Sequence, residues 1–90
     1  MSQAIVDPGE LRRFATQLRR FNDEMMNQMT ALHGQFAGVG QTWRDKEHEK
    51  FAEQFEQTVV VLKRFVEASN QQVPFLLRKA DRVEEYLQQR

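Results

Sequence analysis

The chain contains no cysteine. Without thiols it can form neither disulfides nor thiolate metal sites, and thiol-based catalysis is excluded. Its two histidines, His33 and His48, cannot complete a metal site, because protein metal sites need three or four ligands, and pairing Asp45 with His48 still supplies only two. A chain of 90 residues makes one domain, and so short a domain buries little surface when it folds alone. We therefore expect it to gain stability by associating with another chain.

The chain also lacks an excess of either charge and any long apolar run. Its 13 Lys and Arg residues balance 13 Asp and Glu residues, which argues against nucleic acid as a partner. The longest apolar run, residues 59–62, is far shorter than the roughly 20 residues that cross a bilayer, so we expect no stable membrane insertion. The N-terminal residues have no basic flank and no apolar stretch of signal-peptide length, so we expect no Sec-type export. We expect a cytoplasmic protein that leaves the cell, if it does, by another route.

Nothing in the sequence indicates catalysis. The clustered glycines are not a phosphate-binding loop, because no strand precedes them and no Gly-Lys-Ser/Thr follows. The carboxylates of residues 47–56 are typical of a solvated helix face, since nothing suggests a pocket that would raise a pKa. We predict that the chain is not an enzyme and binds no cofactor and no metal.

Proline and glycine are scarce, and their positions divide the chain. Asp7 suits a helix N-cap and Pro8 suits the first helical position. Gly38 and Gly40 mark the end of that helix. Apolar residues recur every three or four positions between these signals, as on one face of a helix. The first helix is predicted over about residues 8–38, with a loop over 39–44.

A second helix is predicted over about residues 45–73, capped by Thr42 or Asp45. Pro74 removes a backbone hydrogen bond, so we expect a kink or break near Ser69 to Val73. Residues 74–90 keep helical periodicity and are predicted to form a helical C-terminal tail.

The two predicted helices are nearly equal in length, which indicates an all-α fold: an antiparallel helix-turn-helix hairpin with a helical C-terminal extension. Both helices carry apolar arcs too wide to be covered by one neighbour. We therefore predict that two hairpins dimerise into a four-helix bundle, as a homodimer or as a heterodimer with a related small helical chain. The candidate interface residues are Phe14, Leu18, Phe21, Met25, Phe55, Val59, Leu62, Phe65 and Val66.

The predicted loop contains the only tryptophan, in the run Trp43-Arg44-Asp45, shortly after Gly38 and Gly40. A chain of about 100 residues with two amphipathic helices joined by a Trp loop resembles the WXG-motif, ESAT-like family of small hairpins exported by type VII secretion. This resemblance implies a non-enzymatic protein–protein interaction module that travels as a dimer. Asp45 stands where the family has glycine.

The resemblance also concerns the C-terminal end. The family has a tyrosine followed four residues later by an acidic residue, and here Tyr86 is followed by Arg90. In the family, the Trp of one subunit and the tail of the other form a signal that a membrane-associated secretion ATPase binds. The altered tail leaves two alternatives: the chain is not exported by this route, or a partner supplies the tail.

Two interpretations of Trp43 remain open at this stage. A tryptophan offers a large apolar surface, so Trp43 can close the end of the hairpin as a buried anchor. It can equally be exposed for recognition by a partner. If its role is only structural, the alternative function is that of a cytosolic coiled-coil adaptor with no part in export.

Overall fold

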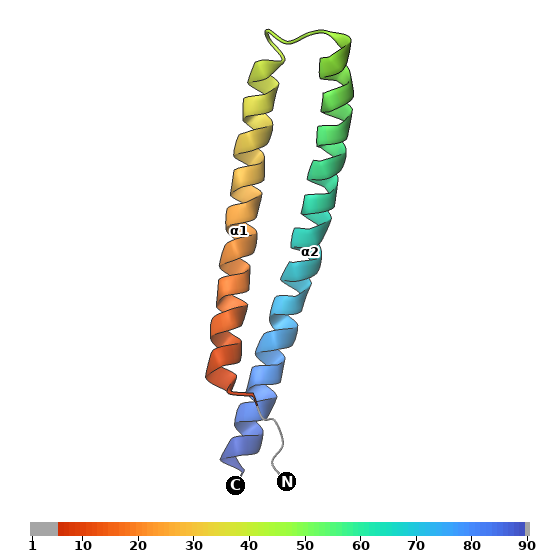
Figure 1. The fold of residues 1–90 in the computed structure, drawn as a ribbon. Coiled ribbons are helices and arrows are strands. Elements are labelled where there is room, and N and C mark those ends of the chain that lie inside the picture. Colours follow the sequence, from red (N-terminus) through yellow and green to blue (C-terminus); the bar gives the residue numbers. More distant parts are fainter. Residues whose placement is uncertain (1–5, 90) are drawn as a thin grey trace.

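The computed structural model describes residues 6–89 and shows two helices that run antiparallel side by side (Figure 1). Helix α1 spans Pro8–Val39 and helix α2 spans Lys46–Gln88. The molecule is a rod of 69 × 20 × 17 Å, with the interhelical loop at one end and the start of α1 and the end of α2 at the other. The predicted all-α antiparallel hairpin is confirmed.

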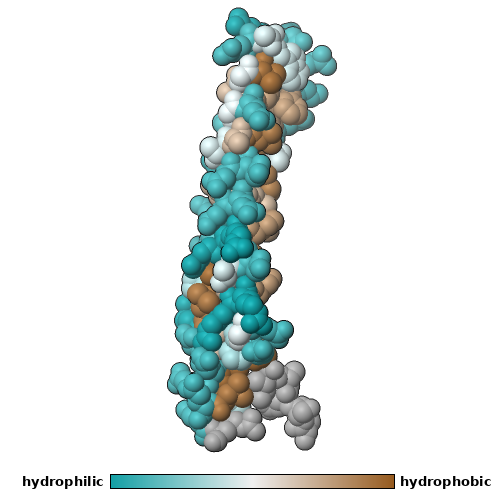
Figure 2. Space-filling view, turned by 90° about the vertical axis from the view of Figure 1, so that its left-hand side faces the viewer, coloured by the Kyte–Doolittle hydropathy of each residue, from teal (hydrophilic) through white to brown (hydrophobic). Residues whose placement is uncertain are grey.

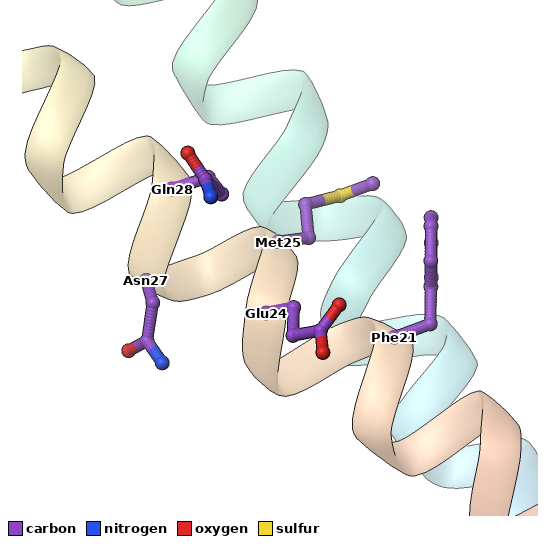
Figure 3. A pocket seen from close by; sticks show the side chains of 5 residues that line it. All are labelled: Phe21, Glu24, Met25, Asn27 and Gln28. Carbon is purple, nitrogen blue, oxygen red and sulfur yellow. The ribbon is translucent and has the colours of Figure 1, made fainter.

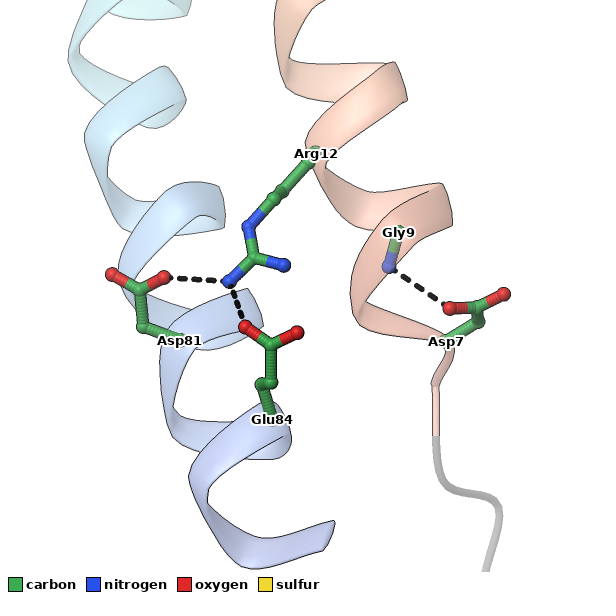
Figure 4. A network of polar contacts seen from close by, with 5 residues as sticks. All are labelled: Asp7, Gly9, Arg12, Asp81 and Glu84. Carbon is green, nitrogen blue, oxygen red and sulfur yellow. Dashed lines mark hydrogen bonds and ion pairs between the residues drawn. The ribbon is translucent and has the colours of Figure 1, made fainter. Parts of the chain in front are cut away.

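Both helices begin at an aspartate that satisfies free backbone N–H groups. The Asp7 carboxylate accepts the Gly9 N–H at 2.9 Å, and Pro8 follows as the first helical residue (Figure 4). The Asp45 carboxylate accepts the His48 N–H at 3.0 Å. Of the two caps considered for the second helix, Asp45 is therefore the one used.

Helix α2 continues through Pro74 to Gln88, so the described residues show no break near Ser69 to Val73, and residues 74–88 extend the helix that was predicted to end at residue 73. The loop covers residues 40–45 instead of 39–44. Proline removes a single hydrogen bond, whereas Val73 and Ala80, on either side of it, are fully packed against α1. The packing of these two residues keeps the chain helical on both sides of Pro74. Pro74 itself is exposed.

The core of the hairpin is a narrow seam of small and medium-sized side chains. In α1 the buried residues recur every seven positions, and in α2 they fall on the a and d positions of the same heptad pattern. Because alanine, valine and serine dominate this seam, the two helices pack on each other but leave the flanking aromatic residues outside. The buried residues are Ala15, Asn22, Met29, Val59, Val66, Ser69, Val73, Ala80 and Val83.

A polar contact lies at the middle of this seam. The Asn22 side chain is fully buried, and its amide nitrogen donates to the Ser69 hydroxyl and to the Asn70 side-chain oxygen, both at 2.9 Å. Within the described residues, the Asn22 side-chain oxygen has no hydrogen-bond partner. A buried amide among apolar side chains is stabilising only in the alignment that supplies its partners, so this contact favours one register of α1 on α2.

Candidate interaction surface

The loop end of the rod is filled by stacked rings around Trp43. Trp43 is half-buried, with its ring edge-on to His48 at 5.1 Å between centroids and tilted against Phe51 at 6.0 Å. His48 stacks in turn on Phe36, at 5.2 Å. The Trp43 backbone N–H donates to the Val39 carbonyl at 2.9 Å, which fixes the loop on the end of α1. Trp43 is thus both an anchor for the loop and partly accessible.

The other residues expected in the export motif do not join Trp43 in one site. Arg44 and Asp45 are exposed beside it, and Asp45 is engaged as the cap of α2. Tyr86 is exposed near the end of α2, at the opposite end of the rod (Figure 1). Arg90 lies outside the described residues. One hairpin therefore holds Trp43 and Tyr86 far apart, and a surface containing both requires two hairpins.

One long face of the hairpin is apolar and open; we call it the outward face. Two grooves lie on it, with volumes of about 480 and 330 Å³. The larger groove brings Phe14 and Leu18 of α1 together with Phe65 and Phe75 of α2. The smaller one is lined by Leu32 and Val39 of α1 and by aromatic residues of α2. The exposed large apolar residues of this face are Phe14, Phe21, Leu32, Val39, Phe51, Val61, Phe65 and Phe75.

A third open groove, of about 690 Å³, lies along α1 itself. Figure 3 shows Phe21 and Met25, one turn apart, projecting to the same side of the helix, while Asn27 points away from them. The outward face therefore continues between the two grooves above. In the upper part of the edge-on view of Figure 2, apolar side chains gather along one side of the rod and polar side chains cover the rest.

The opposite long face carries polar contacts between the two helices. Arg12 contacts Asp81 and Glu84 at 2.8 Å each (Figure 4). The hydrogen bonds from Arg12 to Glu84 and then to Asp81, with the negative charge of both carboxylates, raise the pKa of Arg12 above its usual value. Nearer the loop, His33 and Glu56 approach to 2.6 Å. These pairs are exposed, so they contribute little to stability, but they leave only the outward face suited to an apolar partner.

The structure divides the predicted interface residues into two groups. Phe14, Leu18, Phe21, Met25 and Phe65 lie on the outward face, as does half-buried Phe55. Leu62 is half-buried and lines none of the grooves of that face. Val59 and Val66 are buried inside the hairpin, so their assignment to a dimer interface is wrong. Each helix carries two apolar seams, one packed inside the hairpin and one on the outward face. The sequence alone shows the two seams as one broad apolar arc, so residues of the inner seam were assigned to the interface.

The exposed apolar residues that the predicted interface set left out could have been recognised from the sequence. Phe51, Val61 and Phe75 of α2, with Leu32 and Val39 of α1, belong to heptad seams displaced by one position from the buried ones. If each helix is read as carrying two separate heptad seams, one for each neighbouring helix, these residues fall on the seam that faces outside.

The described residues show no group of three or more His, Cys, Asp or Glu side chains able to hold a metal ion. Neither α1 nor α2 contains a stretch long and apolar enough to cross a membrane.

The fold and the surface define a small all-α hairpin with a tryptophan loop at its end and one open apolar face. The chain belongs to the WXG100 family, described as proteins of 100 residues with WXG, whose family model matches residues 3–88. No curated protein gave a significant match.

Among solved structures, the chain is similar to EsxB, a secreted protein of Bacillus anthracis str. Sterne. The wild-type EsxB structure matches with a TM-score of 0.79 and 23% identity, covering 93% of this chain and 97% of EsxB. A structure of an EsxB mutant matches with a TM-score of 0.82 and 22% identity over 94% of this chain and 96% of EsxB. At this level of identity, the likeness supports the hairpin fold.

Proposed function

We propose that this chain is a non-enzymatic protein–protein interaction module that is exported by type VII secretion, or associated with it, as a dimer. The observation that carries the proposal is the open apolar face on a hairpin of the WXG100 family. In this proposal the protein is cytoplasmic before export. The description of the similar protein EsxB as a secreted protein supports the export part of this proposal.

The exposed area of the hairpin supports the dimer. A compact folded monomer of 10.7 kDa would expose about 5,500 Å². The single hairpin exposes 7383 Å². The difference is roughly a third of the compact value, and a stable interface buries about 800 Å² on each partner. The rod thus has enough excess surface for such an interface.

The separation of Trp43 and Tyr86 fits a signal assembled from two chains. One rod places them at opposite ends, so a secretion ATPase that reads both would bind the Trp loop of one subunit and the tail of the other. Arg90 replaces the acidic residue that the family has at this spacing from Tyr86. We infer that the dimer partner contributes to recognition, and that Trp43 is the part of the signal this chain supplies.

The test is export from cells that carry a type VII secretion system. We expect the protein in the culture medium and its loss from the medium on Trp43→Ala, with the protein still dimeric inside the cells. Trp43→Phe is the matched control, because it keeps a ring against His48 and Phe51 and so separates stability of the loop from recognition of the indole. Equal export of wild type and Trp43→Ala contradicts the proposal.

A second candidate function is that of a cytosolic coiled-coil adaptor. The contacts of Trp43 with His48 and Phe51 favour it, because they give the tryptophan a structural role without any receptor. In that case the protein stays in the cells and Trp43→Ala only lowers the stability of the loop.

A further inference from the structure

We propose that the loop segment of the hairpin, residues 30–58, opens locally while the rest of the hairpin stays folded. In the open state, residues 34–39 at the end of α1 unwind and Trp43 leaves its ring contacts. The opening is a property of the folded hairpin. Its consequence, that Trp43 becomes available to a receptor, rests on the proposed function.

The first observation is where the core of the hairpin ends. The nine buried residues lie within positions 15–29 of α1 and 59–83 of α2. Among the residues that the structure describes, none between positions 30 and 58 is buried. Local opening is expected where a segment buries few apolar side chains. The loop segment therefore lacks the packing that holds the rest of the hairpin together.

The second observation is that the loop segment is held by a cluster of rings of its own. All ring pairs found among the described residues lie within it, from His33 on Phe55, at 6.1 Å between centroids, to Trp43 on His48, at 5.1 Å. Phe36 lies at the centre of the cluster, against three other rings. Every ring in the cluster is half-buried or exposed. These contacts can break together without disturbing the buried seam elsewhere.

The third observation is a pair of glycines near the end of α1. Gly34 and Gly38 lie within the helix, and a side chain on either would meet nothing within 4 Å outside the backbone of that helix. Neither has a positive φ. Packing and backbone geometry therefore do not require glycine at these positions, where it lowers helix stability more than any residue except proline.

The end of α1 lacks two features that commonly stabilise helix ends. Its last turn carries no basic residue to complement the partial negative charge of the helix end. Gly40, which caps the helix, has a right-handed conformation instead of the left-handed one that closes many helices. With the two glycines, these features make the end of α1 easy to unwind.

A fourth observation gives the closed state a cost. The Nε2 atom of His48 is buried, and it has no hydrogen-bond partner within the described part of the chain. It lies beside Gly40, since a Cβ atom there would come within 3.5 Å of it. A buried nitrogen without a partner has lost its hydrogen bond to water. Unwinding the end of α1 exposes this nitrogen to water again, which favours the open state.

Trp43 depends on the same end of α1. Its backbone N–H donates to the Val39 carbonyl at 2.9 Å, and its ring contacts His48, which stacks on Phe36. Unwinding of residues 34–39 removes both supports. The indole, half-buried in the closed hairpin, then becomes fully accessible. Opening of α1 and presentation of Trp43 are therefore one event.

Hydrogen–deuterium exchange of the full chain measures the opening. We expect the amides of residues 34–43 to exchange at least about ten-fold faster than those of the buried seam. Gly34→Ala/Gly38→Ala should slow exchange at residues 34–43 by roughly 25-fold, because each replacement of glycine by alanine changes the opening equilibrium about five-fold. Neither glycine lines a groove of the outward face, so that face is unchanged in the variant.

Thr16→Ala is the matched control. Thr16 is exposed in the part of α1 that has a core, and alanine raises helix stability there as well. With a local opening, Thr16→Ala slows exchange at residues 15–29 and leaves residues 34–43 unchanged. All variants are compared at one protein concentration, because the proposed dimer covers the outward face. If both variants slow exchange equally along the whole chain, the hairpin opens only as one unit and the proposal is overturned.

Export tests the consequence for Trp43. A receptor that binds only the open state binds in proportion to its population, so Gly34→Ala/Gly38→Ala should lower export by up to about 25-fold. Thr16→Ala should be exported like the wild type. Slowed exchange with unchanged export of the double variant overturns the release of Trp43 as a step in recognition. A wild-type chain that opens locally but is not exported contradicts the proposed function and leaves the opening standing.

Discussion

At the scale of single residues, the side chain of Asp45 has a defined role at the start of α2. Asp45 occupies the position where the family has glycine, and it caps α2 by accepting the His48 N–H. His48 is thereby placed between Trp43 and Phe36, so the start of α2 and the aromatic cluster form one unit. With Asp45 in place of the family's glycine, the chain still turns here, and α2 gains a side-chain cap.

This capping role predicts the effect of Asp45→Ala. The variant leaves the first N–H groups of α2 without a side-chain acceptor, so the free energy of unfolding should fall by about 1 kcal/mol in urea denaturation at fixed protein concentration. Thr42→Ala is the control, because the Thr42 hydroxyl only contacts the Val39 carbonyl at 3.4 Å. An equal loss in both variants would argue against the cap.

At the scale of the elements, two amphipathic helices are aligned by a single buried polar contact. Asn22 and Ser69 lie opposite each other in an otherwise apolar seam, and each N–H of the Asn22 amide has a partner. The contact contributes less to stability than to alignment, since the Asn22 oxygen has no partner among the residues that the structure describes.

The contact predicts non-additive substitutions. Ser69→Ala leaves one buried N–H of Asn22 unpaired and should lower the free energy of unfolding by about 1–3 kcal/mol. Asn22→Val/Ser69→Ala replaces both partners by apolar groups, so it should lose less than Ser69→Ala alone. Urea denaturation of the two variants at one concentration measures the difference. Asn70→Ala is the control, because Asn70 is exposed and its loss should be smaller. A double variant that loses as much stability as Ser69→Ala, or more, would contradict this role for the pair.

At the scale of the whole molecule, the rod has two unlike faces. The ion pairs of Arg12 and the His33–Glu56 contact link the helices on one face, and large apolar side chains line the grooves of the other. The hairpin seam consists of small and medium-sized residues, and the aromatic side chains that flank it remain exposed. The side chains that can bury the most surface are thus left exposed for the second chain of the proposed dimer.

Two adjacent valines test which face associates. Val61 lies on the outward face and is 62% exposed, while its neighbour Val60 is 45% exposed but lies off that face. Val61→Asp places a charge in the interface twice per symmetric dimer, so dimerisation should weaken by about 100-fold or more. Val60→Asp should leave the dimer intact. Light scattering across a dilution series measures both, and a monomeric Val60→Asp would place the interface elsewhere.

The helices, their caps and the hairpin could be predicted from the order of residues alone. Asp7, Pro8 and Gly40 mark local boundaries, and the apolar period of three and four is a property of neighbouring residues that needs no tertiary contact. The tryptophan loop was equally visible, since it follows from composition and spacing.

Which apolar seam lies inside was settled by packing between the helices. Seams displaced by one position look alike in sequence, and the choice depends on side-chain size, because small residues such as Ala15 and Ala80 let the two helices approach closely. The same packing carries α2 through Pro74, against the local preference of proline. Local periodicity fixes where helices form, whereas close packing between them fixes which surface is left for a partner.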